Sequence, residues 1–320
     1  MNSIFQGQGI ELFIFRYHRY WVRIYHVLYK LNKIIYITLR RLCKKGDNLE
    51  KILFGISGLP IGNGSDKFNY ASGIDYVKSI GLDAMELLFV RSVNVTDKNK
   101  DIILKTKLNN DIYLSAHGSH YINLNADELE KQEQSITRIV SAVEGLSKVK
   151  GRSLVFHPGF YLKDSKEDTY NTIRENLLRL PHGGIDYRLE TTGKGTQFGT
   201  IKELVSLCKE VSTCKLCIDF SHIHARENGS LKHYDDFIKI LQYVLDELGR
   251  PALDDLHIHM GGINYGEKGE KNHLPLLESD FNFRDCLRAL KDFNVKGCII
   301  SEGPMVEKDA LLLKNTYEKI

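Results

Sequence analysis

The sequence predicts an α/β protein that folds as a (β/α)8 barrel after an N-terminal basic amphipathic helical extension. Eight short segments rich in β-branched or aromatic residues recur from residue 52 onward, and a helical pattern of apolar residues follows each of them. Such strand–helix repeats require a parallel sheet, and eight of them in about 270 residues favour a closed barrel. A doubly wound open sheet is the structural alternative, but the glycine-rich phosphate turn typical of that class has only the short sequence GNG at 62–64 as a counterpart.

The predicted strands are short and end where polar residues begin. In chain order they occupy residues 52–57, 84–90, 112–117, 153–157, 187–191, 215–219, 255–259 and 297–302. The helices between them have apolar residues three or four positions apart, as in Ile136, Ile139 and Val143. The last helix is expected at 306–317, after the eighth strand.

The composition is that of an ordinary globular chain. Of its 320 residues, 42% are hydrophobic and 27% are charged, with a formal net charge of +3, which excludes a largely disordered protein. Six cysteines are too few for the disulfide framework of a chain of this length. We therefore expect reduced thiols and a cytoplasmic location.

Residues 1–50 differ from the rest in charge, and we expect them to form a basic extension in front of a barrel domain at 51–320. They contain nine Lys or Arg against three Asp or Glu, whereas the remaining residues contain 35 against 38. Basic residues three or four positions apart would form one stripe of a helix: Arg16, Arg19, Arg23, His26, Lys30 and Lys33. The segment lacks the long uncharged run of a transmembrane span and the cleavage site of a signal peptide.

Three interpretations of this extension stay open. It could lie at a membrane surface, it could bind a phosphate backbone, or it could be upstream sequence read from a wrongly placed start codon. The candidate functional residues all lie outside it.

Ionisable side chains gather at the predicted carboxyl ends of the strands, which share one mouth in a barrel. In chain order they are His117, His157, Glu190, Asp219, His222, His257, His259, His273 and Glu302. Carboxylates and imidazoles crowded into a partly dry cleft are costly unless they are paired or bind a metal. A set of histidines and carboxylates without cysteine suits catalytic zinc or manganese, and its size favours more than one ion.

Six short motifs around these residues resemble those of one enzyme family. They are SAHGSHYINL at 115–124, FHPG at 156–159, LETTG at 189–193, CIDFSH at 217–222, LHIH at 256–259 and ISEG at 300–303. Together they resemble endonuclease IV, the zinc-dependent family of apurinic/apyrimidinic-site nucleases within the xylose-isomerase-like TIM barrels. QFG at 197–199 and GEKGEKNH at 266–273 are similar to its archaeal-type branch, and the resemblance covers about residues 52–318.

The resemblance implies a centre of two or three Zn²⁺ ions, with Mn²⁺ as an alternative. The implied ligands are His117 and His157 with bridging Glu190 for the first ion, Glu190, Asp219, His257 and Glu302 for the second, and His222 and His273 for the third. Glu190, Asp219 and Glu302 would also be the catalytic carboxylates. His259 has no ligand counterpart in the family and is expected to pack beside the site.

Two positions depart from the family pattern. Lys271 stands where the family has an aspartate two residues before the loop histidine, and a protonated lysine cannot bind a cation. Either Glu270 takes the place of that aspartate, or the third metal is weakly bound or absent. The sequence LES at 277–279 stands where the family usually has Gly-Glu-Gly, so the geometry of that loop is open.

The implied reaction is metal-dependent hydrolysis of DNA phosphodiester bonds 5′ to apurinic/apyrimidinic sites in base excision repair, which leaves a 3′-hydroxyl and a 5′-deoxyribose phosphate. The implied partner is double-stranded DNA with abasic sites, bound by a monomer without a protein partner. The candidate DNA-binding residues are His120, Tyr121, Lys194, Lys268 and Lys271. His120 and Tyr121 match the family residues that wedge into the base stack, and ordinary loop packing is their alternative role.

Two other functions stand as alternatives. A sugar isomerase or epimerase of the same barrel superfamily usually holds one metal with two Glu, an Asp and a His, so that His117, His157 and His222 would be surplus. A non-catalytic binding protein anchored to a membrane by residues 1–50 is the third candidate, and Lys271 would then mark a degraded site.

Overall fold

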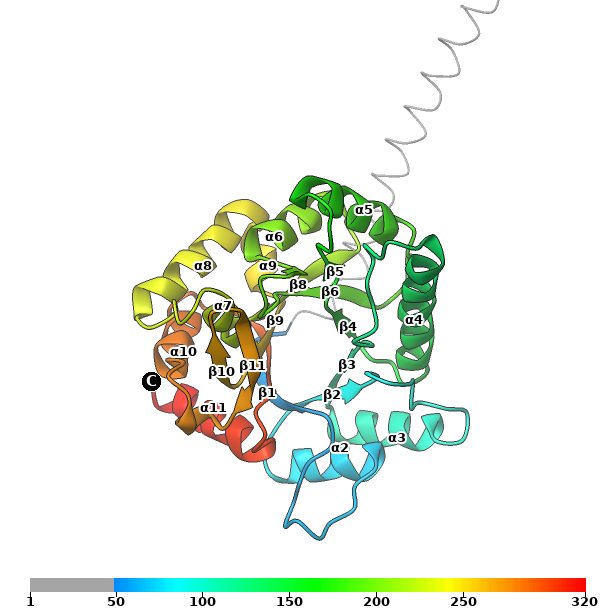
Figure 1. Ribbon diagram of the computed structural model, residues 1–320. Coiled ribbons are helices and arrows are strands. Elements are labelled where there is room, and N and C mark those ends of the chain that lie inside the picture. The colour runs from blue at the N-terminus through cyan, green and yellow to red at the C-terminus, as the bar shows by residue number, and fades with distance from the viewer. Residues whose placement is uncertain (1–48) are drawn as a thin grey trace, which may run out of the picture. The chain divides into compact units, whose positions relative to one another are not determined.

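Eight parallel strands close into one barrel in the computed structural model, which describes residues 49–320 (Figure 1). The barrel strands are β1 (Ile52–Ser57), β2 (Ala84–Leu88), β3 (Tyr113–His117), β4 (Ser153–Phe156), β6 (Asp186–Glu190), β8 (Cys214–Asp219), β9 (Leu256–Met260) and β12 (Gly297–Ser301). Each pairs in parallel with the next in this series, and β12 closes the ring against β1. The predicted fold class is confirmed for this part of the chain. Residues 1–48, which hold nearly all of the predicted extension, lie outside the described residues.

The predicted strands agree with the barrel strands to within two residues at each end. The small differences affect two candidate ligands, because His157 and Glu302 each directly follow a strand instead of ending it. Both side chains therefore leave the sheet at the mouth of the barrel, where the carboxyl ends of the strands meet.

Helices surround the barrel and cover its outer face (Figure 1). They are α2 (Tyr70–Ser79), α3 (Lys100–Asn110), α4 (Leu129–Lys148), α5 (Lys166–Leu178), α6 (Ile201–Glu210), α7 (Phe220–Arg226), α8 (Tyr234–Leu248), α9 (Arg250–Leu253), α10 (Phe283–Asp292) and α11 (Glu307–Lys319), with a 3₁₀ turn η1 (Leu276–Glu278). Capping boxes at Asn69 and Thr200 define the starts of α2 and α6. Within residues 49–320, none of the helices combines the length and the apolar character needed to span a bilayer.

Two short antiparallel strand pairs that the sequence did not predict lie outside the barrel sheet. Strand β5 (Gly159–Phe160) pairs with β7 (Gln197–Phe198), and β10 (Gly262–Gly266) pairs with β11 (Gly269–Leu274). Gly269 has φ +91°, and a Cβ there would lie 2.2 Å from the carbonyl oxygen of Gly193. The turn of the β10–β11 hairpin thus lies directly against the loop that follows β6.

Alternation along the strands separates the apolar core from the barrel interior. Met85 and Leu87 of β2 and Ile258 of β9 are fully buried members of the main hydrophobic cluster. The residues between or beside them, Glu86 and His259, are also fully buried but polar. Because successive side chains of a strand point to opposite faces, the apolar layer packs under the helices while polar groups face the interior.

An ion-pair network closes the end of the barrel opposite the mouth. Arg188 is only 1% exposed, and its Nη2 lies 2.9 Å from Oδ1 of Asp255, which precedes β9. Nζ of Lys215 lies 2.5 Å from carboxylate oxygens of both Asp186 and Asp255. Burial would raise the pKa of Asp255, but the neighbouring cations Arg188, Lys215 and Arg152 hold it well below its usual range.

We expect the Asp255→Ala substitution to lower the free energy of unfolding by about 3–5 kcal/mol, because it leaves the buried Arg188 guanidinium without its nearest carboxylate. Asp254→Ala is the matched control, since Asp254 pairs with Arg250 at the surface and the loss should stay below about 1 kcal/mol. Urea unfolding of the two variants measures both values. Equal losses would show that the network at the barrel floor contributes no more than a surface pair.

Candidate metal centre

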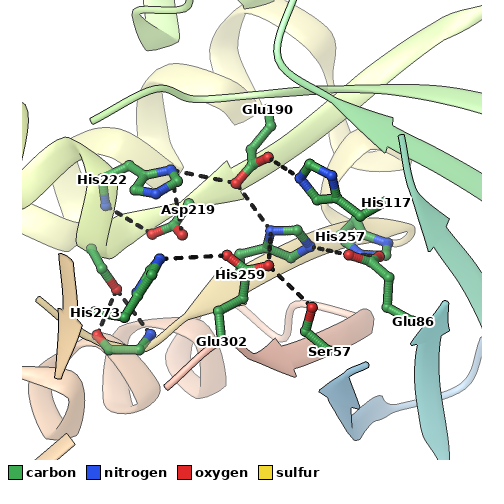
Figure 2. Close-up of polar contacts among 12 residues, drawn as sticks. Ser57, Glu86, His117, Glu190, Asp219, His222, His257, His259, His273 and Glu302 are labelled. Carbon is green, nitrogen blue, oxygen red and sulfur yellow. Dashed lines mark hydrogen bonds and ion pairs between the residues drawn. The ribbon is translucent and has the colours of Figure 1, made fainter. Parts of the chain in front are cut away.

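Imidazoles and carboxylates from separate strands converge at the mouth of the barrel, as Figure 2 shows. The contributing positions are His117 at the end of β3, His157 after β4, Glu190 at the end of β6, Asp219 at the end of β8, His222 in α7, His259 in β9, Glu270 and His273 in β11, and Glu302 after β12. They converge because the carboxyl ends of all strands in a parallel barrel open to one side. The structure therefore brings together side chains that are up to 185 residues apart in the chain.

Glu190 lies at the centre of this group and is fully buried. Its Oε2 lies 3.0 Å from Nε2 of His117 and 2.9 Å from Nε2 of His157. Its Oε1 lies 3.0 Å from Nδ1 of His259 and 3.4 Å from Nδ1 of His222. Each carboxylate oxygen thus faces two imidazole nitrogens, an arrangement suited to a carboxylate shared between two cations.

A second set of donors adjoins the Glu190 carboxylate. Glu190, Asp219, His259 and Glu302 each offer one ligand atom, and these atoms lie within 4.8 Å of one another. Oε1 of Glu302 is 3.5 Å from Nδ1 of His259 and accepts a hydrogen bond from the Ser57 hydroxyl at 3.3 Å. Asp219 is held in place because its Oδ1 caps α7 by accepting from the His222 backbone N–H at 2.8 Å.

A third set lies toward the β10–β11 hairpin. Asp219, His222, His273 and Glu302 also offer ligand atoms within 4.8 Å of one another. Oε2 of Glu270 is 3.7 Å from Nε2 of His222, and the absence of a side chain at Gly193 makes room for it, because a Cβ there would lie 2.6 Å from that oxygen.

Lys271 points away from the candidate ligands. Its side chain is exposed, and its Nζ would lie 3.0 Å from a Cβ built on Gly266 of the opposite hairpin strand. Of the two alternatives that the sequence left open, the geometry favours Glu270 as the residue that takes the place of the family aspartate.

The geometry favours a different histidine of strand β9 as the ligand from the one that the sequence predicted. The resemblance implied His257 as a ligand and His259 as a packing residue, whereas the structure places His259 beside Glu190 and His257 one step deeper in the barrel. Nε2 of His257 faces Glu86 at 3.0 Å, and its Nδ1 lies 3.3 Å from the Cys298 thiol. The register explains the difference, because β9 pairs His259, not His257, with Asp219 of β8.

Glu86 and Ser57 support the centre, although the sequence pattern did not predict them. Glu86 is a fully buried carboxylate in the middle of the otherwise apolar strand β2, and Ser57 ends β1. A carboxylate within an apolar strand itself indicates a group with buried polar partners, because it is costly to bury without them. Glu86 was not predicted because it lies two residues before the end of its strand, and the predicted ligands were sought at strand ends.

Hydrogen bonds set the orientation of two of the candidate ligands. Nδ1 of His117 is 2.9 Å from the carbonyl oxygen of Gly118, and Nδ1 of His222 is 2.9 Å from that of Thr191. A carbonyl only accepts, so these nitrogens carry a proton, and Nε2 is the nitrogen of each ring that would bind a cation once its own proton has left. Both rings are thus held in the orientation in which a cation would be bound through Nε2.

Charges in the centre shift the pKa values of its histidines strongly. Burial would lower the pKa of His117, but the Glu190 carboxylate raises it to about 9. Burial and the neighbouring His117 and His157 lower the pKa of His120 to about 4. The His117 proton must leave before that ring can bind a metal, so metal uptake would release protons.

The buried donor set fits divalent cations. Among the described residues, Oδ2 of Asp219 and Nδ1 of His273 are buried without a hydrogen-bond partner. Unpartnered buried polar atoms are costly, and coordination of a cation removes that cost. Imidazole and carboxylate donors together suit zinc or manganese.

The candidate DNA-binding residues lie around the same mouth. His120 and Tyr121 follow β3, and the Tyr121 side chain is 70% exposed. The His120 ring centroid lies 5.4 Å from that of His117. Lys194, which bridges to Gly269, and Lys268 are both exposed at the hairpin turn.

Comparisons with known proteins relate the chain to one fold family. The family model described as xylose isomerase-like TIM barrel matches residues 74–316. An uncharacterized protein of Methanocaldococcus jannaschii is 47% identical over 276 residues, which cover 84% of this chain and 98% of that protein. A probable endonuclease 4 of Aster yellows witches'-broom phytoplasma is 24% identical over 208 residues, which cover 60% of this chain and 70% of that protein.

Two solved structures are similar in fold. Endonuclease IV from Thermus thermophilus has a TM-score of 0.63 at 20% identity, with 84% of this chain and 100% of that chain covered. A D-tagatose 3-epimerase-like protein has a TM-score of 0.64 at 19% identity, with 84% and 96% covered. At these identities the two likenesses establish the fold alone.

We expect the His259→Gln substitution to lower the zinc content of the purified protein by about one ion per chain, because one ligand of the central set is lost. His257→Gln is the matched control and should keep the zinc content of the unsubstituted protein. Elemental analysis after dialysis against zinc, with circular dichroism to verify folding, measures both. Loss of zinc in the His257 variant alone would support His257 as the ligand and contradict the role proposed for His259.

A second prediction concerns the hairpin. Glu270→Gln should weaken the most weakly bound zinc ion by about 10-fold or more, because the carboxylate facing His222 is replaced by a poor ligand. Lys271→Met should leave every zinc affinity unchanged, since its ammonium group points away. Titration with a zinc-binding chromophore distinguishes the two, and a stronger effect at Lys271 would contradict the role given to Glu270.

Proposed function

The chain belongs to the xylose isomerase-like TIM barrel family, and from this premise we propose that it is a metal-dependent endonuclease acting on double-stranded DNA. It would hydrolyse the phosphodiester bond 5′ to apurinic/apyrimidinic sites in base excision repair, leaving a 3′-hydroxyl and a 5′-deoxyribose phosphate. The probable endonuclease 4 relative and the endonuclease IV structure support this proposal at the level of the family.

The observation that carries the proposal is the surplus of imidazoles around Glu190. A centre for a single ion is complete with Glu190, Asp219, His259 and Glu302. His117 and His157 converge on the far oxygen of Glu190, where they have no role in such a centre. Two cations that share a carboxylate are the arrangement used in phosphoryl hydrolysis, where attacking and leaving oxygens both need stabilisation.

Divalent ions held here would polarise the phosphoryl group and lower the pKa of water from 15.7 toward about 7. The role of the chain is to hold the donor groups in a fixed orientation. Glu190 sets the spacing of the donors on its two oxygens, and Glu302 is anchored through the Ser57 hydroxyl. Because these donors are buried and already in place, little reorganisation is needed when charge develops on the substrate.

The DNA would lie across the mouth, where exposed residues surround the centre. Tyr121 is 70% exposed, and an exposed aromatic ring next to the His117 loop can stack on a base next to an abasic gap. Lys194, Lys268 and Lys271 place positive charge at the hairpin side, which the phosphate backbone requires since residues 51–320 carry a net negative charge.

A sugar isomerase or epimerase is the second candidate. It is favoured by the one-ion set of Glu190, Asp219, His259 and Glu302 taken alone, which has the two Glu, one Asp and one His typical of that activity. The fold is also similar to that of the D-tagatose 3-epimerase-like protein. We rank this candidate second because it gives no role to His117 and His157.

Three further expectations complete the proposal. We propose that the protein acts as a monomer, that residues 1–50 form a basic extension separate from the barrel, and that the protein is cytoplasmic. The five cysteines within the described residues are free thiols, which supports a reducing compartment.

The full-length protein supplied with Zn²⁺ or Mn²⁺ should nick a duplex oligonucleotide that carries a tetrahydrofuran abasic analogue, on the 5′ side of the analogue. Glu190→Gln should lower the nicking rate by about 100- to 1,000-fold, because the shared carboxylate that orients both groups of donors is lost. Gel analysis of end-labelled product measures the rate and the position of the cut.

Glu133→Gln, at an exposed carboxylate of α4, is the control and should nick as fast as the unsubstituted protein. Absence of nicking with either metal would refute the nuclease. Interconversion of ketose epimers by the same preparation, abolished by Glu190→Gln, would then favour the second candidate.

A further inference from the structure

Glu86 is a buried carboxylate that the metal centre as described does not use. It is the third residue of β2, it is fully buried, and the other residues of that strand are apolar. A carboxylate at such a position is strongly destabilising unless its oxygens have partners. Figure 2 shows it at the right of the candidate ligands, facing the imidazoles of β9.

Three groups lie beside the Glu86 carboxylate, two histidines at ion-pair distance and one hydroxyl in a hydrogen bond. Oε1 lies 3.0 Å from Nε2 of His259, and Oε2 lies 3.0 Å from Nε2 of His257. Oε2 also accepts a hydrogen bond from the Ser115 hydroxyl at 2.8 Å. Strands β2 and β9 are not neighbours in the sheet, so Glu86 reaches these two rings across the interior of the barrel.

His257 and Ser115 keep the carboxylate in one orientation. Nδ1 of His257 lies 3.3 Å from the Cys298 thiol, which can donate its proton to that nitrogen. A neutral His257 then carries its own proton on Nε2, facing Glu86. With His257 and Ser115 both on Oε2, the other oxygen of Glu86 is directed at His259.

His259 has carboxylates on both sides of its ring. Its Nδ1 lies 3.0 Å from Glu190 and 3.5 Å from Glu302, and its Nε2 faces Glu86. An imidazole that binds a cation through one nitrogen carries its proton on the other. The same division holds at His117, where the backbone carbonyl of Gly118 faces Nδ1 and Glu190 faces Nε2.

We propose that Glu86 is a positioning residue, which holds the Nε2 proton of His259 and thereby presents Nδ1 of that ring as the ligand between Glu190 and Glu302. A carboxylate behind a ligating histidine fixes the ring and makes it a stronger ligand. The inference rests on the metal centre of the proposed function and not on the identity of its substrate.

The test compares Glu86→Gln with Glu307→Gln in the full-length protein. The amide keeps the shape of the side chain but removes the negative charge that faces His259. Glu307 is also a buried carboxylate, but it accepts hydrogen bonds from the backbone N–H groups of Ile61 and Gly62 and contacts none of the candidate ligands. The same chemical change is thus made at two buried sites, only one of which faces a ligand.

We expect Glu86→Gln to weaken zinc binding by about 10- to 100-fold in competition with a chromophoric chelator, and Glu307→Gln to leave it unchanged. Nitrogen-15 NMR of the zinc-loaded protein should show His259 protonated at Nε2 and metal-bound at Nδ1. In the Glu86 variant the signals of that form should shift or broaden.

Two results would overturn the inference. Unchanged zinc affinity together with an unchanged His259 spectrum would leave Glu86 with a structural role only. Loss of one whole zinc ion, with the remaining affinities unaltered, would make Glu86 a ligand itself. Because neither measurement uses DNA, a protein that fails to nick abasic DNA but shows the expected shifts would retain Glu86 as a positioning residue while refuting the nuclease.

Discussion

The carboxylate of Glu190 has two imidazole nitrogens near each of its oxygens, all between 2.9 and 3.4 Å away. A buried anion in this position has to be compensated, and in the described part of the chain the compensating groups come from β3, β9, α7 and the segment after β4. The mouth of the barrel is therefore organised around one charge. Each surrounding element must keep its register, because a shift of one residue would turn a ligand away from Glu190.

The interior of the barrel is polar at three levels, whereas apolar layers fill most barrels of this kind. Arg188 and Asp255 form the floor, Glu86 and His257 the middle, and the candidate metal centre the mouth. The hydrophobic contribution to folding comes mainly from the shell between strands and helices, and a smaller cluster contains Ala84, Tyr113, Cys298 and Ile300. Polar interiors of this kind define one register for each strand, because a slipped strand would leave buried charges without partners.

The β10–β11 hairpin places Glu270 beside the third set of donors, at His222. Glu270 faces His222 and Lys271 faces solvent, because successive residues of a strand point to opposite sides. Gly193 provides the space for the Glu270 carboxylate, and Gly269 allows the hairpin turn to contact the loop after β6. This geometry supports the proposal that Glu270, one position before Lys271, takes the place of the family aspartate.

The barrel and most of the candidate ligands could be predicted from the sequence. Strand periodicity is a local feature, and so are polar residues at strand ends such as His117, Glu190 and Asp219. Only the tertiary structure shows that His259 lies beside Glu190, that Lys271 is turned to solvent, and that Glu86 faces the histidines of β9. The physical reason is that both β9 histidines point inward and differ only in depth. The depth of each histidine in the barrel depends on the stagger between β8 and β9. Its contact with Glu86 depends on the position of β2 on the other side of the barrel. Both are relations between distant segments, which no local pattern encodes.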